Sequence, residues 1–433
     1  MTSVLAPRTL GEIIRRRTVV PAEALTAAAG IVDAVRREGE RAVRQQAERF
    51  GELKPNEALV IERPALEQAL SSLDRVDRDR LERVAGRIRA FADAQRAALR
   101  ELTVAVPGGQ AGHTVAPVER AGGYAPGGRY PLPSSVLMTA VTARAAGVRE
   151  VWVASPKPTP LVLAAAAVAD VTGVLPIGGA HAIAALAYGT GPAPACDVVV
   201  GPGNHYVTAA KRLVAGDVGI DLLAGPSELL VFADRSADPS LVAADLLAQA
   251  EHDPCALPVL VAVGTWLPMQ VEREIDRQLT DLPTADVARA ALANGGVITV
   301  DTIDDAIRVC DAIAPEHLQL HLADAATVAP RLKHYGALFI GEGAGEVLGD
   351  YGIGPNHVLP TGGTARWTGG LSVLTFLRVR SWLRITDPAA ARAVSDDAAW
   401  FGRAEGLEAH ARAAERRLLV PDTGESLEPG VAS

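Results

Sequence analysis

The sequence is poor in three features that would each point to a particular class of protein: cysteine, aromatic residues and positive charge. Its 433 residues include 3 cysteines and 4% aromatic residues, and carry a formal net charge of -9. Cys196, Cys255 and Cys310 show no CxxC spacing, which argues against a disulfide framework and a thiolate zinc site. A surface for nucleic acid or an anionic membrane needs clustered Lys and Arg, so we expect neither partner.

Long uncharged apolar runs are absent as well. No run reaches the roughly 18 apolar residues that a membrane-spanning helix needs. The N-terminal stretch MTSVLAPRTLGEIIRRR lacks an apolar core of signal-peptide length. We therefore expect a cytoplasmic protein. The hydrophobic content of 48% over 433 residues is enough for a large core divided into two or more domains.

The sequence does contain a regular alternation of short β-branched runs and Ala-rich helical stretches. EVWVAS, GVLPIGGAHAIAALA and DVVVGPGNHYVTAAKRLV follow this pattern in one part of the chain. A second series contains PVLVAVG, GGVITV and GALFIGEG as strands. This alternation is typical of parallel, doubly wound sheets, so the sequence predicts two α/β units in tandem.

These patterns predict four segments. An N-terminal arm, residues 1–20, precedes a first α/β domain made of residues 21–118 and 230–380, whose N-terminal part is helical. Residues 119–229 form a second α/β domain, and residues 381–433 form a helical tail. The tail ends in PDTGESLEPGVAS, which we expect to be disordered.

The segment DLLAQAEHDP, residues 245–254, places Gln249 and His252 three positions apart. If the run is helical, both side chains lie on one face, where they can bind the same metal ion. Two ligands alone do not hold a metal. A histidine also favours the C-terminus of a helix, beside a stop such as Asp253 and Pro254. The segment alone leaves both interpretations open.

Three further segments carry polar residues suited to catalysis or binding. APEHLQLH sets Glu316 beside His317, where an acid and a base of different pKa can serve one reaction centre, although an exposed Glu-His pair is more common. LGDYGIGPNHVLPTGG places Asp350 in a Gly-rich segment, which we expect to be a ligand or active-site loop. RAEGLEAHARA sets Glu405 and His410 five positions apart, and alone it is typical of an exposed helix.

Gly-rich turns stand between strand and helix in VVVGPGNHYVTAAK and LPIGGAHAIAALA. Such turns bind nucleotides, because bare backbone N–H groups and a helix N-terminus face the phosphates. Neither turn has the strict GxGxxG pattern, and tight turns need glycine for other reasons. GGYAPGGRYPLPSS adds a third loop, in which Tyr124 is placed where its ring can stack on a ligand.

Taken in order, these segments resemble the histidinol dehydrogenase family over nearly the whole chain. The resemblance is carried by GGYAPGGRYPLPSSVLM, GGAHAIAALAYGT, GPGNHYVTAAKR, AGPSELLVFAD, LLAQAEHD, APEHLQLH, GDYGIGPNHVLPTGGTARW with GLSVLTFLR, and AEGLEAH. It implies two tandem Rossmann-like, aldehyde-dehydrogenase-like domains, with a helical N-terminal segment and a helical C-terminal tail.

The resemblance also implies a set of site residues. The family's zinc ligands correspond to Gln249, His252, Asp350 and His410, and its catalytic acid–base pair to Glu316 and His317. Its substrate contacts correspond to Ser227, Gln249, His252, His317, Asp350, Glu405 and His410. Its cofactor contacts correspond to Tyr124, His181 and Asn204.

Two positions depart from the family's pattern. His181 stands where the family usually has Gln in GGAQAIAAL, and Gln319 stands where the usual segment is HLE. An imidazole can still donate or accept one hydrogen bond at position 181. Either substitution is compatible with a relative of this family that oxidises a different alcohol.

For function, the resemblance implies an NAD-dependent, zinc-requiring, four-electron oxidation of L-histidinol through L-histidinal to L-histidine. It also implies one zinc ion per subunit and a homodimer with composite active sites. No cysteine lies in a matched catalytic segment, so we do not expect covalent catalysis. Two alternatives remain: a same-fold dehydrogenase acting on another amino or hydroxy alcohol, and a non-catalytic metal or ligand-binding protein, which would not need adjacent Glu316 and His317.

Overall fold

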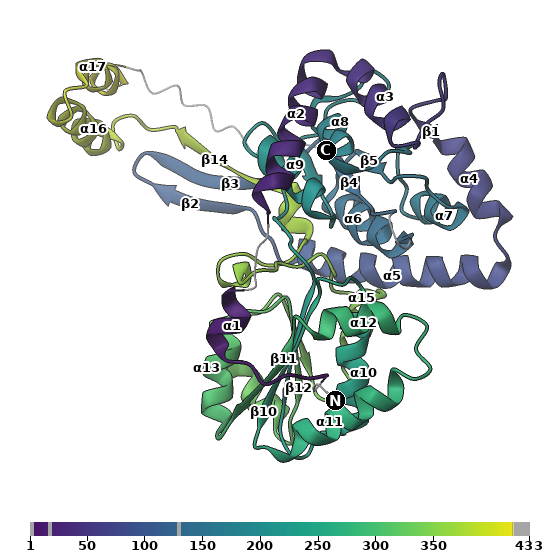
Figure 1. Cartoon of the computed structure of the whole chain (residues 1–433). Coiled ribbons are helices and arrows are strands. Elements are labelled where there is room, and N and C mark those ends of the chain that lie inside the picture. The colour runs from purple at the N-terminus through teal and green to yellow at the C-terminus, as the bar shows by residue number, and fades with distance from the viewer. Residues whose placement is uncertain (1–3, 16–19, 128–130, 418, 420–433) are drawn as a thin grey trace. The chain divides into compact units, whose positions relative to one another are not determined.

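A computed structural model describes residues 4–15, 20–127, 131–417 and 419 of the chain. The chain divides into two compact units (Figure 1). The core unit comprises Met1–Arg96 and Val118–Phe376, and the appended unit comprises Ala97–Pro117 and Leu377–Ser433. The disorder expected for residues 421–433 concerns a segment outside the described residues. Among the described helices, none has both the length and the apolar character of a bilayer span.

The first sheet of the core unit has six strands in the order β1-β6-β5-β4-β7-β8. The strands are β1 (Ile61–Glu62), β4 (Arg120–Tyr124), β5 (Glu150–Ala154), β6 (Gly173–Leu175), β7 (Val198–Val200) and β8 (Gly219–Ile220). All neighbours pair in parallel except β1, which is antiparallel to β6. The connecting helices are α6 (Pro133–Ala146), α7 (Pro160–Val168), α8 (Gly179–Tyr188) and α9 (His205–Val214). This is a doubly wound sheet whose strand order reverses between β4 and β7.

Helices from the N-terminal part of the chain also pack on this first sheet. They are α2 (Ala22–Glu38), α3 (Glu40–Arg49) and α4 (Arg63–Ser72), whereas the following helix α5 (Arg75–Ala97) contacts Gly352 through Arg87. One face of α2 buries Ala24, Ala28, Val32 and Val35 against α8 and α9, and α4 contacts α7. The sequence prediction had grouped residues 21–118 with residues 230–380. The structure differs because small and β-branched residues on α2 fit the Ala-rich faces of α8 and α9, and because β1 pairs with β6.

The second sheet of the core unit has five parallel strands in the order β11-β10-β9-β12-β13. They are β9 (Glu228–Ala233), β10 (Leu257–Val263), β11 (Gly296–Val300), β12 (His317–His321) and β13 (Ala337–Ile340). The accompanying helices are α10 (Pro239–Ala250), α11 (Trp266–Gln278), α12 (Ala285–Leu292), α13 (Ile303–Ile313), α14 (Ala325–Val328) and α15 (Glu346–Asp350). Short 3₁₀ turns cover Ala329–Arg331, Thr364–Arg366 and Val373–Phe376. In the predicted arm, α1 (Leu10–Arg15) contacts α13.

The appended unit contains an antiparallel sheet that the sequence analysis missed. Its strands, β2 (Leu102–Val106), β3 (Gly109–Pro117) and β14 (Leu377–Ile385), are ordered β14-β3-β2. Two helices follow, α16 (Arg392–Ala404) and α17 (Glu408–Arg417). Residues 381–385, predicted as the start of a helical tail, belong to β14, because this segment pairs along β3. The β2–β3 turn requires glycine at Gly108, where φ is +75° and a Cβ would lie 2.3 Å from the Asp387 carbonyl oxygen.

Candidate active site

The residues predicted for catalysis in the core unit meet where β9 and β12 begin. Ser227 directly precedes β9, and Glu316 directly precedes β12. Helix α10 connects β9 to its parallel neighbour β10 and therefore returns to this edge, which puts Gln249 in its last turn beside the strand starts. Doubly wound folds usually bind ligands at the carboxyl ends of strands. This cluster instead lies at the amino ends of the strands, since its residues come from the starts of β9 and β12 and from the end of α10.

Glu316 is buried at the entrance to β12. Helix α13 ends at Ile313, and Ala314 adopts a left-handed conformation (φ +50°) that directs the chain into the strand. The Glu316 carboxylate accepts hydrogen bonds from Ser227 Oγ at 2.7 Å and from the Glu228 amide at 2.8 Å. Burial raises the pKa of Glu316 well above its usual range, against the opposing effect of these hydrogen bonds. The pair is not the exposed Glu-His pair that the sequence left open.

His317 is the first residue of β12, and its two ring nitrogens have different surroundings. Nδ1 lies 2.9 Å from the Glu228 carbonyl oxygen, which can only accept, so Nδ1 carries the proton. Nε2 is buried, has no hydrogen-bond partner among the described residues, and lies 3.8 Å from Asp350 Oδ1. This arrangement leaves an Nε2 lone pair that can accept a proton from a bound molecule.

Gln249 and His252 lie one turn apart, as their spacing predicts. Helix α10 ends at Ala250, but the turn continues, with the His252 amide 3.4 Å from the Gln249 carbonyl oxygen. Gln249 is fully buried and its Nε2 has no hydrogen-bond partner in the part of the chain described. His252 is more exposed, and its Nε2 lies 3.6 Å from Asp350 Oδ2. The structure thus brings three predicted metal ligands, Gln249, His252 and Asp350, to one place.

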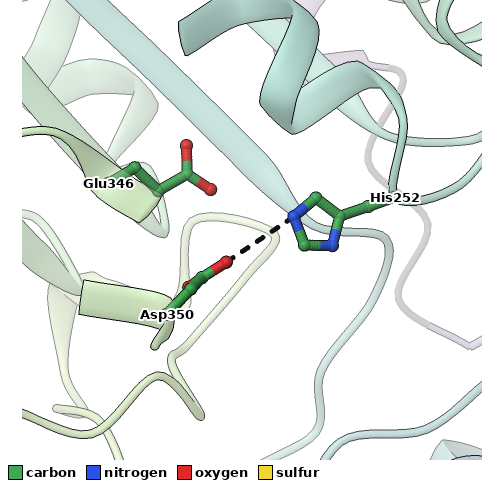
Figure 2. Close-up of side chains that lie close together, drawn as sticks. All are labelled: His252, Glu346 and Asp350. Carbon is green, nitrogen blue, oxygen red and sulfur yellow. Dashed lines mark ion pairs between the residues drawn. The ribbon is translucent and has the colours of Figure 1, made fainter. Parts of the chain in front are cut away.

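Glu346 is a further residue of this cluster, and the sequence analysis did not identify it. His252, Glu346 and Asp350 each direct one possible ligand atom to a common point, with all of these atoms within 4.8 Å of one another (Figure 2). The sequence predicts that Asp350 lies in a Gly-rich loop. In the structure Asp350 is instead the buried last residue of the short helix α15. Glu346 begins the same helix, and its spacing of four from Asp350 was the available signal.

The cluster gathers the carboxyl groups of Glu316, Glu346 and Asp350 in a buried space. Burial, reinforced by the nearby Asp350 and Glu316 carboxylates, raises the pKa of Glu346 to about 8. Its Oε2 atom has no hydrogen-bond partner among the residues described. A divalent cation would favour the ionised forms of these carboxyl groups and use these unpaired atoms. The nitrogen and oxygen donors suit a borderline metal such as zinc.

The predicted cofactor residues form a second cluster, at the carboxyl ends of the first sheet's strands. Tyr124 ends β4, and Asn204 caps α9 after β7, accepting hydrogen bonds from the amides of Tyr206 and Val207. These two strands flank the point where the strand order reverses, the usual nucleotide position. Gly201 has φ +116°, and a Cβ there would lie 2.2 Å from the Tyr124 carbonyl oxygen, so only glycine fits this turn.

His181 is close to this second cluster but is engaged by protein atoms. It lies in the first turn of α8, with Nε2 2.8 Å from Glu52 Oε2 and its ring stacked on Phe50 at 5.7 Å. The side chain is 1% exposed, and Nδ1 has no hydrogen-bond partner in the described chain. The Gly179 amide, two residues earlier, donates to the Tyr124 hydroxyl at 3.2 Å.

Glu405 and His410 lie in the appended unit. Glu405 caps the C-terminus of α16, and His410 lies in the first turn of α17. Both residues are exposed. Of the predicted metal and substrate residues, those of the core unit lie together: Ser227, Gln249, His252, His317 and Asp350.

The two clusters define the class of protein: a two-domain α/β dehydrogenase, with Gly-rich turns at one switch point and a buried acid–base pair beside nitrogen and oxygen donors. The sequence family model for histidinol dehydrogenase matches residues 14–418. The chain belongs to the histidinol dehydrogenase family.

Individual relatives agree with this assignment. The chain is 48% identical to a histidinol dehydrogenase of Thermus thermophilus over 392 residues, which cover 90% of this chain and 93% of that protein. It is 45% identical to one of Parasynechococcus marenigrum, over 90% of each chain. The crystal structure of histidinol dehydrogenase from Elizabethkingia anophelis superimposes with a TM-score of 0.89 at 28% identity, covering 97% of this chain and 99% of that one.

Proposed function

We propose that the protein oxidises L-histidinol through L-histidinal to L-histidine, with NAD as the hydride acceptor and one zinc ion per subunit. This is the final part of histidine biosynthesis, and we place it in the cytoplasm. The observation that carries the proposal is the buried pair Glu316 and His317, whose different hydrogen-bond partners suit two proton transfers at one centre. The choice of histidinol as the substrate rests on membership of the histidinol dehydrogenase family.

The donor atoms of the core unit fit zinc. Gln249, His252 and Asp350 offer amide, imidazole and carboxylate groups, and we propose them as ligands together with His410. The unpaired buried atoms of Gln249 and Glu346 support this assignment. When bound, zinc would hold the substrate's amino and imidazole nitrogens, while NAD would accept the hydride.

His317 and Glu316 would divide the proton transfers. His317 Nε2 is oriented by the bond from Nδ1 to the Glu228 carbonyl, and it takes the proton of the substrate hydroxyl. Glu316 takes a proton from the water molecule that adds to the aldehyde. Its raised pKa makes its carboxylate a stronger base than an exposed one. Ser227, bonded to Glu316, is proposed to contact the substrate as well, as are the metal ligands and Glu405.

NAD would bind at the carboxyl edge of the first sheet. The amino ends of α8 and α9 and the backbone of the Gly-rich turns offer donors for the pyrophosphate. Tyr124 and Asn204 are the proposed contacts, and burial raises the pKa of Tyr124 to about 12, so its hydroxyl keeps its proton. His181 is proposed as a third contact, directly or through the turn that it holds.

We further propose a homodimer in which each appended unit supplies Glu405 and His410 to the partner's site. The appended unit exposes large apolar side chains, which a second copy could cover. They include Val379, Leu383, Trp400 and Phe401.

The alternative is a dehydrogenase of the same fold that acts on another amino or hydroxy alcohol, since His181 and Gln319 depart from the family's usual residues. The test is a comparison of kcat/KM for histidinol, histidinal, and amino alcohols without an imidazole. A preference of about 100-fold or more for the imidazole substrates supports the proposal, because a site that pairs polar substrate atoms rejects analogues lacking them. A higher value for another alcohol would replace histidinol.

A further inference from the structure

Strand β12 carries three polar side chains on one face, of which the proposed function uses one. His317, Gln319 and His321 alternate along the strand and are all buried. The intervening Leu318 and Leu320 point into the apolar core of the other face. A central parallel strand is usually apolar on both faces, so this polar row needs specific partners.

Gln319 bonds to two different helices at once. Its Nε2 donates to Asp245 Oδ2 of α10 at 2.5 Å. Its Oε1 accepts a hydrogen bond from the Glu346 amide, at the start of α15, at 3.2 Å. The side chain itself is fully buried.

These two helices carry the proposed metal ligands of the core unit. Asp245 precedes Gln249 by one turn on α10, and His252 follows the end of that helix. Glu346 and Asp350 are the two ends of α15. The helices approach closely, since a Cβ on Gly345 would lie 3.7 Å from Asp245 Oδ1. Gln319 therefore connects the two segments between which the ligand atoms converge.

An amide meets both requirements at position 319 without having to take up a proton. The Glu346 N–H needs an acceptor, whereas the Asp245 carboxylate needs a donor, and this fixes the orientation of the amide. Glu, which the family usually has here, would meet both requirements only when protonated, and once ionised it would set two carboxylates against each other in a buried place. His321 supports the same carboxylate, with Nε2 3.0 Å from Asp245 Oδ2.

We propose that Gln319 is a positioning residue for the metal centre: by linking Asp245 to the Glu346 amide, it fixes the spacing between the ligands on α10 and those on α15. The inference rests on the proposed metal site. Residues that orient ligands without touching the metal typically change metal affinity by roughly 10- to 100-fold when replaced.

The test measures Zn²⁺ affinity of the full-length protein, stripped of metal, by competition with a chromophoric chelator. Gln319→Leu, which removes both hydrogen bonds, should weaken Zn²⁺ binding by roughly 10- to 100-fold and alter the visible absorption of the Co²⁺-loaded protein. Gln319→Glu should also weaken binding. Adding Asp245→Asn to Gln319→Glu restores one donor facing one acceptor, so the double variant should regain most of the affinity.

Gln278→Leu is the matched control, since Gln278 donates its amide to the Ser240 carbonyl at the far end of the same helix α10. It should leave Zn²⁺ affinity unchanged. Wild-type affinity in Gln319→Leu, or a double variant as weak as Gln319→Glu, would overturn the inference. A wild-type protein that binds no stoichiometric Zn²⁺ would instead overturn the proposed metal site. The rescue comparison keeps the test decisive even if Gln319→Leu fails to fold.

Discussion

Glu316 and His317 are neighbours in the sequence, yet their side chains have different partners and therefore different proposed tasks. Glu316 is held by Ser227 and the Glu228 amide, while His317 is oriented by the Glu228 carbonyl. Glu316→Gln keeps the shape of the side chain but removes the base for water activation. We expect it to oxidise histidinol to the aldehyde level, while oxidation of supplied histidinal falls by roughly 100- to 10,000-fold.

The measurement is single-turnover NADH formation from each substrate. Equal losses with histidinol and with histidinal would contradict this division between the two residues. Ser227→Ala, which removes one hydrogen bond to Glu316 and leaves the carboxylate in place, is the matched comparison and should reduce histidinal oxidation less.

The cysteines provide a second prediction at this scale. Burial raises the pKa of Cys196 to about 12 and raises that of Cys310 as well. The pKa of Cys255 is also raised, by partial burial and the neighbouring Asp253, but this thiol is exposed to solvent. At pH 8 a thiol reagent should slowly label one cysteine in the native protein and three after unfolding, because the two buried thiols are neither ionised nor accessible in the folded chain.

The raised pKa of Cys196 also determines how the free energy of unfolding changes with pH. Folded Cys196 keeps its proton above the unfolded pKa of about 8.5, so its contribution to the free energy of unfolding declines as pH rises from there toward 12. Cys255→Ala should remove native labelling and retain activity. A large loss of activity in Cys255→Ala would contradict our expectation that catalysis uses no cysteine nucleophile.

At the scale of single residues, much of the candidate site could be predicted, because the resemblance assigns an expected role to each matching position. Glu346 was missed because its segment was interpreted as a Gly-rich loop, whereas Glu346–Asp350 is a short helix. Glu52 could not be predicted as the partner of His181, since the two are far apart in the sequence and meet only when the chain folds.

At the scale of elements, β-branched runs followed by Ala-rich stretches correctly predicted the parallel strands and their helices. The antiparallel sheet of β14, β3 and β2 was missed because β14 is distant in sequence from the hairpin of β2 and β3, and because its segment, LRVRSWLRI, is rich in Arg. The location of the catalytic cluster at strand starts was also not predictable, since it depends on where α10 ends relative to β9 and β12.

The start of α8 yields a prediction about this element. The His181 ring is stacked on Phe50 and bonded to Glu52, so it ties the Gly-rich turn before α8 to the segment that follows α3. His181→Gln loses the stacking, and we expect KM for NAD to change several-fold while KM for histidinol stays nearly constant. Glu52→Gln removes the carboxylate and should shift KM for NAD in the same direction.

Initial rates at varied NAD and saturating histidinol provide the measurement, with direct NAD binding by fluorescence as a second readout. An unchanged NAD profile in both variants would mean that His181 only fills space in the core of the first sheet.

For the whole molecule, the proposed homodimer predicts that lesions in different units can complement each other. His410→Ala and Glu316→Gln should each be nearly inactive in the oxidation of supplied histidinal, which is the activity measured in this test. If His410 acts in the partner's site, a mixed dimer has both lesions in one site and an intact second site. Random exchange of subunits makes about half of the dimers mixed, so activity should recover to roughly a quarter of the wild-type value.

Subunit exchange must be verified independently, for example with two differently tagged variants. No recovery after verified exchange would place His410 in the site of its own subunit. A protein that stays monomeric in sedimentation analysis would contradict the composite site itself.

The central claim is that one site carries out both oxidations, from alcohol to aldehyde and from aldehyde to acid. The most direct test supplies the purified, zinc-loaded protein with limiting histidinol and excess NAD, and counts the NADH formed per substrate consumed. We expect about two NADH per histidinol, with histidine as the product and no accumulated aldehyde. About one NADH with free histidinal, or none at all, would contradict it.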